Sequence, residues 1–118
     1  MKTNPIYETL IFPAAEQDLL DIKEYFETKL YTSPDSLFQK VYNQIDLIER
    51  NPFMYPLVKD TLLSSLGYHI IPIDNYLLFY VVNDKTIEIH RFLSFYHLQH
   101  KTKEEAQKIA HYLVAQKL

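Results

Sequence analysis

The spacing of apolar residues changes period early in the chain. Residues 6–12 form a short apolar run rich in β-favouring side chains, and Pro13 ends it, which predicts a strand. Apolar residues then recur at spacings of three and four, which predicts an amphipathic helix. The stripe of that helix consists of Ala15, Leu19, Ile22, Phe26 and Leu30.

A second amphipathic helix follows after a short connection. Ser33 suits the N-cap, and Pro34 suits the first helical position because its missing N–H needs no partner there. The helix should end at Asn51, because a residue that precedes proline disfavours helical backbone. Two helices so closely linked form an antiparallel hairpin whose apolar faces need a sheet to cover. The second stripe consists of Leu37, Val41, Ile45 and Ile48.

Three apolar segments in the second half of the chain predict a β-meander. They span residues 68–73, 76–82 and 87–95, and short polar turns separate them. The middle segment is apolar at successive positions, which is typical of a central strand covered on both faces. Pro72 cannot donate to a strand ladder, so its strand lies at an edge or carries a bulge.

A last helix is predicted over residues 102–116. Thr102 and Glu105 match a capping box, and an apolar stripe follows them. The predicted order is strand, helix, helix, three strands, helix (β-α-α-β-β-β-α). The fold class is therefore α+β, and residues 1–118 form a single domain.

The amino-acid composition excludes several kinds of binding site. The chain has a single glycine, Gly67, which excludes the Gly-rich phosphate loops, and it has no cysteine, which excludes disulfides and thiolate metal sites. None of the five histidines shows metal-ligand spacing. We therefore expect no metal and no cofactor. The net charge of −3 gives no electrostatic footprint for nucleic acid.

The location expected from the sequence is the cytoplasm. The first residues, 1–5, are polar and do not resemble a secretion signal. No apolar run approaches the roughly 20 residues that span a membrane. We therefore expect no membrane partner.

Four local motifs occur in register with this element order. The first motif follows the opening strand and consists of Ala15, Asp18, Leu19, Ile22 and Tyr25. The second lies at the end of the second helix and consists of Ile45, Ile48, Asn51-Pro52 and Tyr55-Pro56. The third consists of Gly67-Tyr68-His69 with Asn75-Tyr76 and Phe79-Tyr80, and the fourth consists of Ile87, Ile89, Arg91, Phe92 and Leu93. With these motifs, over about residues 6–97, the chain resembles the RelE/ParE toxins of bacterial type II toxin–antitoxin systems.

The resemblance implies both a fold and a partner. It implies a twisted sheet of three or four strands with the helical hairpin on one face and a concave opposite face. It also implies a growth inhibitor that a cognate antitoxin neutralises through a segment that orders on binding. A homodimer and a hetero-oligomer with the antitoxin both stay open.

The family divides into two branches with different targets. One branch cuts messenger RNA on the ribosome, and the ParE-like branch poisons DNA gyrase. A ribonuclease needs basic side chains at the phosphate and an acid–base pair at the 2′-hydroxyl. The candidates for those roles are Tyr96, His97, His69 and Lys59.

The ribonuclease set is incomplete in this sequence. Leu77 stands where many ribonuclease members carry arginine. Strand alternation would also send the side chains of Tyr96 and His97 to opposite faces. ParE-like binding of gyrase therefore fits better. An mRNA endoribonuclease and a non-toxic binding module stay as alternatives, so whether the chain is an enzyme stays open.

Three residues are candidates for contact with the antitoxin or target: Arg91, Tyr76 and Tyr80. Arg91 shares the alternation of Ile87 and Ile89, which predicts that it lies on their apolar face. A basic side chain there pairs with a carboxylate or binds backbone carbonyls of a partner.

Overall fold

Six elements follow one another in the part of the chain that the computed structural model describes, residues 7–57 and 64–94. Their order confirms the α+β class. The helix predicted over residues 102–116 lies outside the described residues. The elements are β1 (Glu8–Ile11), α1 (Pro13–Thr28), α2 (Asp35–Arg50), β2 (Tyr68–Ile73), β3 (Tyr76–Asn83) and β4 (Thr86–Ser94).

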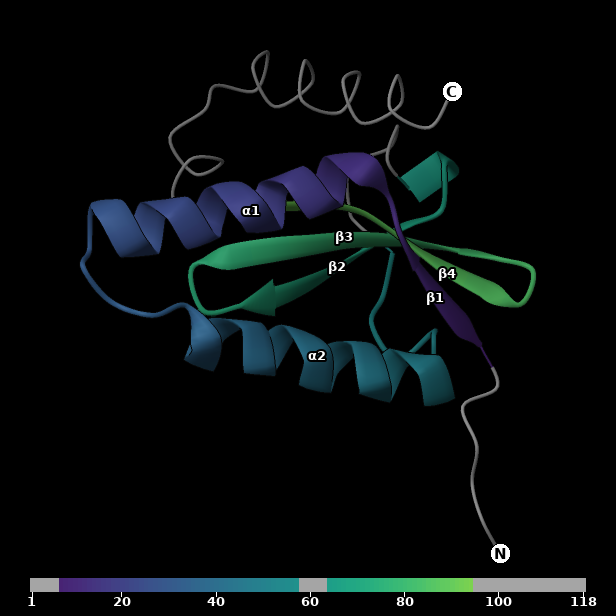
Figure 1. Cartoon of the computed structure of the whole chain (residues 1–118). Helices are drawn as coiled ribbons and strands as arrows, with labels where there is room; N and C mark the ends of the chain where they lie inside the picture. Colours follow the sequence, from purple (N-terminus) through teal and green to yellow (C-terminus); the bar gives the residue numbers. More distant parts are fainter. Residues whose placement is uncertain (1–6, 58–63, 95–118) are drawn as a thin grey trace, which may run out of the picture.

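The four strands form one sheet in the order β1-β4-β3-β2 (Figure 1). The meander of β2, β3 and β4 is antiparallel, as predicted. β1 joins it in parallel, with Glu8 opposite Thr86. β2 is an edge strand, which agrees with the position of Pro72 in it.

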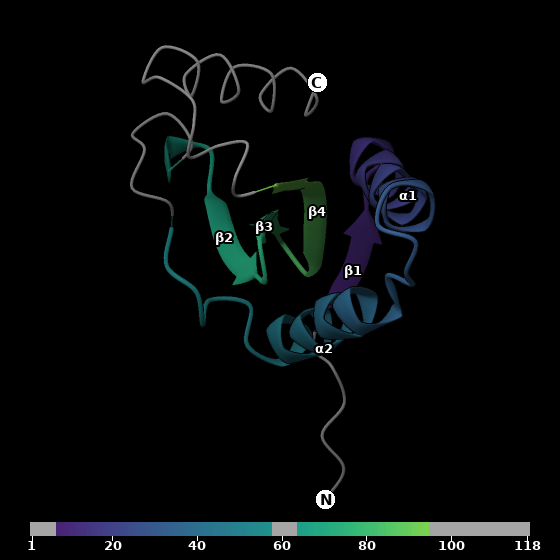
Figure 2. The same cartoon turned by 90° about the vertical axis from the view of Figure 1, so that its left-hand side faces the viewer.

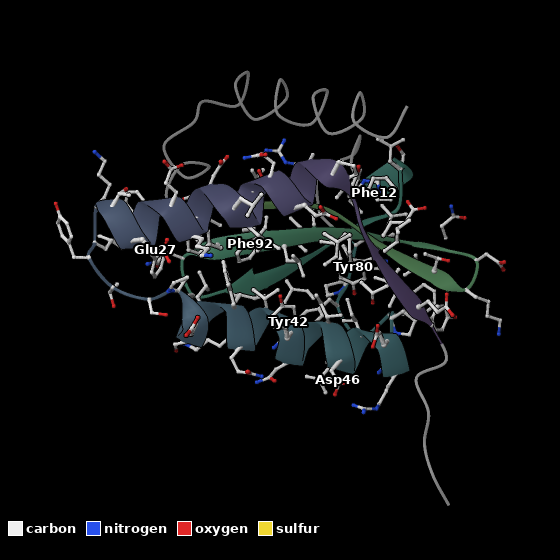
Figure 3. All side chains as sticks on the ribbon, in the orientation of Figure 1. Phe12, Glu27, Tyr42, Asp46, Tyr80 and Phe92 are labelled. Carbon is white, nitrogen blue, oxygen red and sulfur yellow. The ribbon has the colours of Figure 1, made fainter. Side chains whose placement is uncertain are left out.

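The two helices take different places around the sheet (Figure 2). α2 lies against one face, and α1 lies beside β1 and β4. Tyr80 and Phe92 lie in the interior between α1 and α2 (Figure 3). The buried core on this face combines α2 residues Leu37, Val41, Ile45 and Ile48 with sheet residues Ile71, Ile73, Leu78, Tyr80, Ile87, Ile89 and Phe92.

The opposite face of the sheet has a smaller buried cluster. Tyr68, Phe79 and Val81 form it, and all three are at most 4% exposed. Successive residues of β3 therefore enter opposite cores, because adjacent side chains of a strand point to opposite faces. This confirms the prediction that the middle strand is covered on both sides.

A β-bulge in β4 corrects one expectation from the sequence. Phe79 pairs with Arg91 and Tyr80 pairs with Ile89, so His90 is an extra residue in β4. The extra residue reverses the alternation beyond it. Phe92, and not Arg91, therefore continues the face of Ile89. The prediction that Arg91 shares that face is wrong.

The ends of α2 match the signals in the sequence. The Ser33 hydroxyl accepts a hydrogen bond from the Asp35 N–H at 3.1 Å, but α2 begins at Asp35 with Pro34 at the N-cap, one residue later than predicted. The helix ends at Arg50, before Asn51-Pro52. The second helix therefore begins within one residue of its predicted start and ends at its predicted stop.

Candidate functional site

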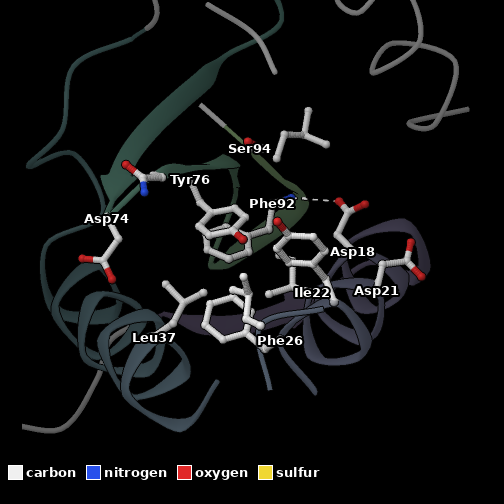
Figure 4. Close-up of a pocket in the computed structure, with 13 residues that line it drawn as sticks. Asp18, Asp21, Ile22, Phe26, Leu37, Asp74, Tyr76, Phe92 and Ser94 are labelled. Atoms are coloured by element: carbon white, nitrogen blue, oxygen red, sulfur yellow. Dashed lines mark hydrogen bonds between the residues drawn. The ribbon is translucent and has the colours of Figure 1, made fainter. Parts of the chain in front are cut away.

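A groove of about 820 Å³ opens between α1, the first turn of α2 and the ends of β3 and β4 (Figure 4). Its walls come from elements far apart in the sequence, which the crossing of α1 over the end of β4 brings together. The residues that line it are Asp18, Asp21, Ile22, Tyr25, Phe26, Leu30, Leu37, Asp74, Asn75, Tyr76, Phe92, Leu93 and Ser94. We refer to it as the α1–sheet groove.

The floor of the α1–sheet groove is apolar and aromatic. Tyr76 stacks on Phe92, with 5.1 Å between ring centroids and 24° between ring planes. Burial raises the pKa of Tyr76, and the nearby phenol of Tyr25 adds to the increase. Ile22 and Phe26 face these rings from α1 (Figure 4). Such a floor suits the apolar side chains of a bound segment.

The rim of the groove is acidic. Asp21 and Asp74 stand on opposite sides of it, and Asp18 lies deeper (Figure 4). Lys40 approaches Asp74, with 2.9 Å between Nζ and Oδ1, but this pair is exposed and therefore weak. The lining residues include no lysine or arginine. An apolar segment that carries a positive charge complements this arrangement.

Asp18 fixes one end of the groove. Its carboxylate accepts two hydrogen bonds from Arg91, from Nε at 2.7 Å and from Nη2 at 2.9 Å. It also accepts the backbone N–H of Phe92 at 2.9 Å. β1 pairs with β4 only as far as Ile89, so Asp18 bonds a part of the β4 edge that β1 does not reach. Arg91 is therefore held by α1 at the end of the groove.

His69 is a buried part of the core side of the sheet. It is only 6% exposed, and its Nδ1–H donates to the Tyr55 carbonyl at 2.7 Å. Its ring stacks on Tyr80 at 5.0 Å between centroids and meets the edge of Phe53 at 6.0 Å. The side chain thus joins β2 to the segment that follows α2.

Tyr80 is also buried, with no exposed surface. Its hydroxyl donates to the Pro52 carbonyl at 2.8 Å, and burial raises its pKa above the ordinary tyrosine value. In this structure the side chain supports the end of α2. Of the three candidate contact residues, only Tyr76 lines the α1–sheet groove.

The remaining candidates for RNA cleavage lie outside the described residues. They are Lys59, Tyr96 and His97.

A hydrogen-bonded network that the sequence did not predict lies on the opposite sheet face. Glu88 Oε1 accepts a hydrogen bond from His90 Nε2 at 3.0 Å, because a carboxylate can only accept. The other ring nitrogen of His90, Nδ1, forms a hydrogen bond with the Tyr68 hydroxyl at 2.5 Å. Asn83 donates to the other Glu88 oxygen at 3.0 Å. Phe12 stacks on His90 at 4.3 Å between centroids.

Burial raises the pKa of the tyrosine in this hydrogen-bonded network. It raises the pKa of Tyr68 to about 12, and the charge of Glu88 adds to the increase. Tyr68 and His90 are at most 1% exposed, so no substrate reaches them in this structure. The spacing of Glu88 and His90 by two residues on one strand was a signal for their contact. Tyr68 belongs to the third motif, but nothing in the sequence indicated its contact with His90.

Neither a metal-ligand cluster nor a membrane-spanning helix occurs among the described residues. Over residues 7–57 and 64–94, no three His, Asp or Glu side chains are grouped to hold a metal ion. No helix within those same ranges has the length and apolar character to cross a lipid bilayer.

Comparison with known proteins gives a family match. The profile described as the ParE toxin of the type II toxin–antitoxin system, parDE, matches residues 10–94. A solved structure, the chromosomal ParDE TA system from P. aeruginosa, has a similar fold with a TM-score of 0.58 at 13% sequence identity. That similarity covers 77% of this chain and 98% of the other. No curated protein sequence matches the chain.

Proposed function

Because the chain belongs to the ParE toxin family of type II toxin–antitoxin systems, we propose that it arrests growth by binding DNA gyrase and does not cut messenger RNA. The family makes the chain the toxin of such a pair and gives it an antitoxin as partner. The choice of gyrase rests on what the described basic residues do in the fold.

The observation that carries the proposal is that Arg91 and His69 both form hydrogen bonds within the fold. A ribonuclease needs such groups turned toward the scissile phosphate. Arg91 is instead paired with Asp18 at 2.7 Å, and both side chains are at most 13% exposed. His69 is buried and donates to the Tyr55 carbonyl. Within the described residues, neither group is placed to bind a phosphate.

Leu77 supports the same choice. It pairs with Leu93 on β4 and packs with the apolar cluster on the outer sheet face. An arginine at that position would serve an RNA backbone, whereas leucine suits packing or a protein surface. A protein target needs no cluster of phosphate-binding cations.

The antitoxin is proposed to occupy the α1–sheet groove. The floor of Tyr76, Phe92 and Phe26 offers aromatic surface, and the carboxylates of Asp21 and Asp74 stand at the rim. We expect the antitoxin segment to present apolar side chains with a lysine or arginine among them. Such a segment gains its order on binding.

Gyrase supercoiling and mRNA cleavage separate the two targets. The purified chain should inhibit supercoiling of relaxed plasmid by gyrase, and its cognate antitoxin should reverse the inhibition. Primer extension on a messenger translated in a reconstituted bacterial system should give no new 5′ ends. New ribosome-dependent ends would overturn the proposal in favour of an endoribonuclease. Inactivity in both assays would favour a non-toxic binding module.

Variants test the same choice in cells. Tyr96→Phe and His97→Ala should both retain growth arrest, because binding to gyrase involves no chemical step at these groups. Loss of arrest in both, with unchanged thermal unfolding, would indicate the ribonuclease instead.

The groove is tested by titration with the cognate antitoxin. Tyr25 lines it and is 50% exposed, so Tyr25→Ala should weaken binding, and Asp21→Lys should weaken it further by reversing a rim charge. Leu47→Ala is the matched control, because Leu47 is 44% exposed on α2 and is not in the groove lining. Equal affinity of all four proteins would remove the groove from the interface.

A further inference from the structure

A second groove lies on the other flank of α1, between α1 and α2. Its volume is about 400 Å³, and it shares no lining residue with the α1–sheet groove. We call it the hairpin groove. The residues that line it are Ile11, Glu16, Leu19, Leu20, Lys23, Phe38, Val41 and Tyr42.

The hairpin groove has an apolar surface that the fold itself does not use. Leu20 is 59% exposed and Tyr42 is 57% exposed, although both lie beside residues of the core. Burial of a leucine side chain gives roughly 1.5–3 kcal/mol, so its exposure is informative when it borders a groove. Leu20 projects from α1 at the edge of the groove, and most of the other lining residues are also apolar.

The charges of the groove have a pattern of their own. Glu16 and Lys23 are seven residues apart on α1, which is two helical turns, so both side chains lie on the same face as Leu19 and Leu20. Over residues 7–57 and 64–94, neither Glu16 nor Lys23 has an ion-pair partner. The face thus carries one charge of each sign at opposite ends of an apolar centre.

We propose that the hairpin groove is the interface between two copies of this chain, with α1 packed antiparallel against α1. A two-fold axis between positions 19 and 20 places Glu16 opposite Lys23 of the second copy, and Lys23 opposite its Glu16. The same axis brings Leu20 of each copy to Leu19 and the groove of the other. The surface is self-complementary, which is what an isologous interface requires.

The occupant follows from this symmetry. Positions 16 and 23 lie at equal distances from the axis and carry opposite charges, so the face of α1 is complementary to its own copy. A second copy satisfies both charges at once, in two equivalent pairs, at the 8–10 Å separation typical of packed helices. Because the two grooves share no lining residue, this dimer leaves the α1–sheet groove open to the antitoxin.

Sedimentation equilibrium of the full chain with charge reversals tests the proposal. The unmodified chain should form a dimer. Glu16→Lys or Lys23→Glu alone should raise the dissociation constant about tenfold or more, since each places two like-charge pairs across the axis. The combined variant Glu16→Lys/Lys23→Glu should restore the dimer, because the pairs form again with their signs exchanged.

Two further variants complete the test. Leu20→Asp should give a monomer, since it places two carboxylates in the apolar centre. Lys85→Glu is the matched control, because Lys85 is exposed in the turn between β3 and β4, and it should leave the dimer unchanged. Thermal unfolding of each variant establishes that it is folded. A monomeric unmodified chain would overturn the proposal, and so would a dimer that is insensitive to Leu20→Asp or a double reversal that fails to restore association.

Discussion

Asp18 and Arg91 lie 73 residues apart in the chain and are joined by two parallel hydrogen bonds, of 2.7 and 2.9 Å. The pair fastens the first turns of α1 to the second half of β4. The same carboxylate holds the Phe92 N–H, so one side chain positions both the helix and the strand edge. The α1–sheet groove is bounded by this junction.

Removing one partner of the Asp18–Arg91 pair should destabilise the fold strongly. Asp18→Ala leaves the guanidinium and the Phe92 N–H without the carboxylate, so we expect the free energy of unfolding to fall by about 3 kcal/mol or more. Urea denaturation followed by circular dichroism measures the change. Asp46→Ala is the matched control. It breaks the Asp46–Arg50 pair, whose side chains are about half exposed, and should change stability by less than ~1 kcal/mol.

Arg91 has two competing roles, which the same measurements distinguish. If it acts through Asp18, Arg91→Ala and Asp18→Ala should both lower stability, and the double variant should be far from additive. An Arg91→Ala variant of normal stability that loses affinity for antitoxin or gyrase would instead make Arg91 a contact residue.

The Tyr80 hydroxyl should have a measurable structural role. Tyr80→Phe removes the hydrogen bond to the buried Pro52 carbonyl and leaves that carbonyl without this donor. We expect a loss of about 1–2 kcal/mol in the free energy of unfolding. Tyr42→Phe on the exposed side of α2 should have no effect. If the two variants had equal stability, the hydroxyl of Tyr80 would contribute nothing to the fold.

Stability should fall at alkaline pH. Burial raises the pKa of Tyr68 from 10.0 to about 12 and raises that of Tyr80 as well, so folding favours the neutral phenols. The unfolded chain loses these protons first. Their contribution is therefore complete below pH ~10 and is lost as the pH rises from about 10 toward 12.

Urea midpoints between pH 8 and 12 check this expectation, at roughly half-unit steps that bracket the ordinary tyrosine pKa. Tyr68→Phe should flatten the decline, whereas Tyr31→Phe should not, because Tyr31 is 86% exposed. A midpoint that does not change over this range would contradict the assignment of buried neutral phenols.

Gly67 should resist replacement because of its backbone and not for lack of space. Its φ is +84°, and a Cβ there would meet Val81 Cγ1 at an ordinary 3.9 Å. Gly67→Ala should therefore lower stability by about 1–2 kcal/mol, and Gly67→Asn should lower it less, since asparagine tolerates left-handed backbone. Thermal unfolding of the pair measures the difference. Equal losses would point to a steric cause instead.

The strand and helix boundaries were predictable because they depend on local signals. Pro13, the Ser33-Pro34 cap and the Asn51-Pro52 stop each act on neighbouring backbone, and the structure places helix ends beside them. The meander followed from short polar turns between apolar runs. Proline, capping residues and short polar turns act on the local backbone independently of residues far away in the sequence.

The bulge and the site were not predictable in the same way. His90 is an extra residue in β4 opposite β3, and no local signal in the sequence marks a bulge at that position. From the sequence, Asp18 was only one member of the motif that follows the opening strand. Its role depends on where α1 crosses β4, which only the tertiary packing decides.

The parallel pairing of β1 with β4 has a consequence for synthesis. β1 leaves the ribosome early, yet its partner in the sheet lies 78 residues later, as the pairing of Glu8 with Thr86 shows. At about 5–20 residues per second, this separation corresponds to a wait of roughly 4–16 s. Because β4 lies between β1 and β3, β1 cannot join the sheet during that interval. The α1–sheet groove, which includes residues of β4, therefore forms only after almost the whole described domain has been translated.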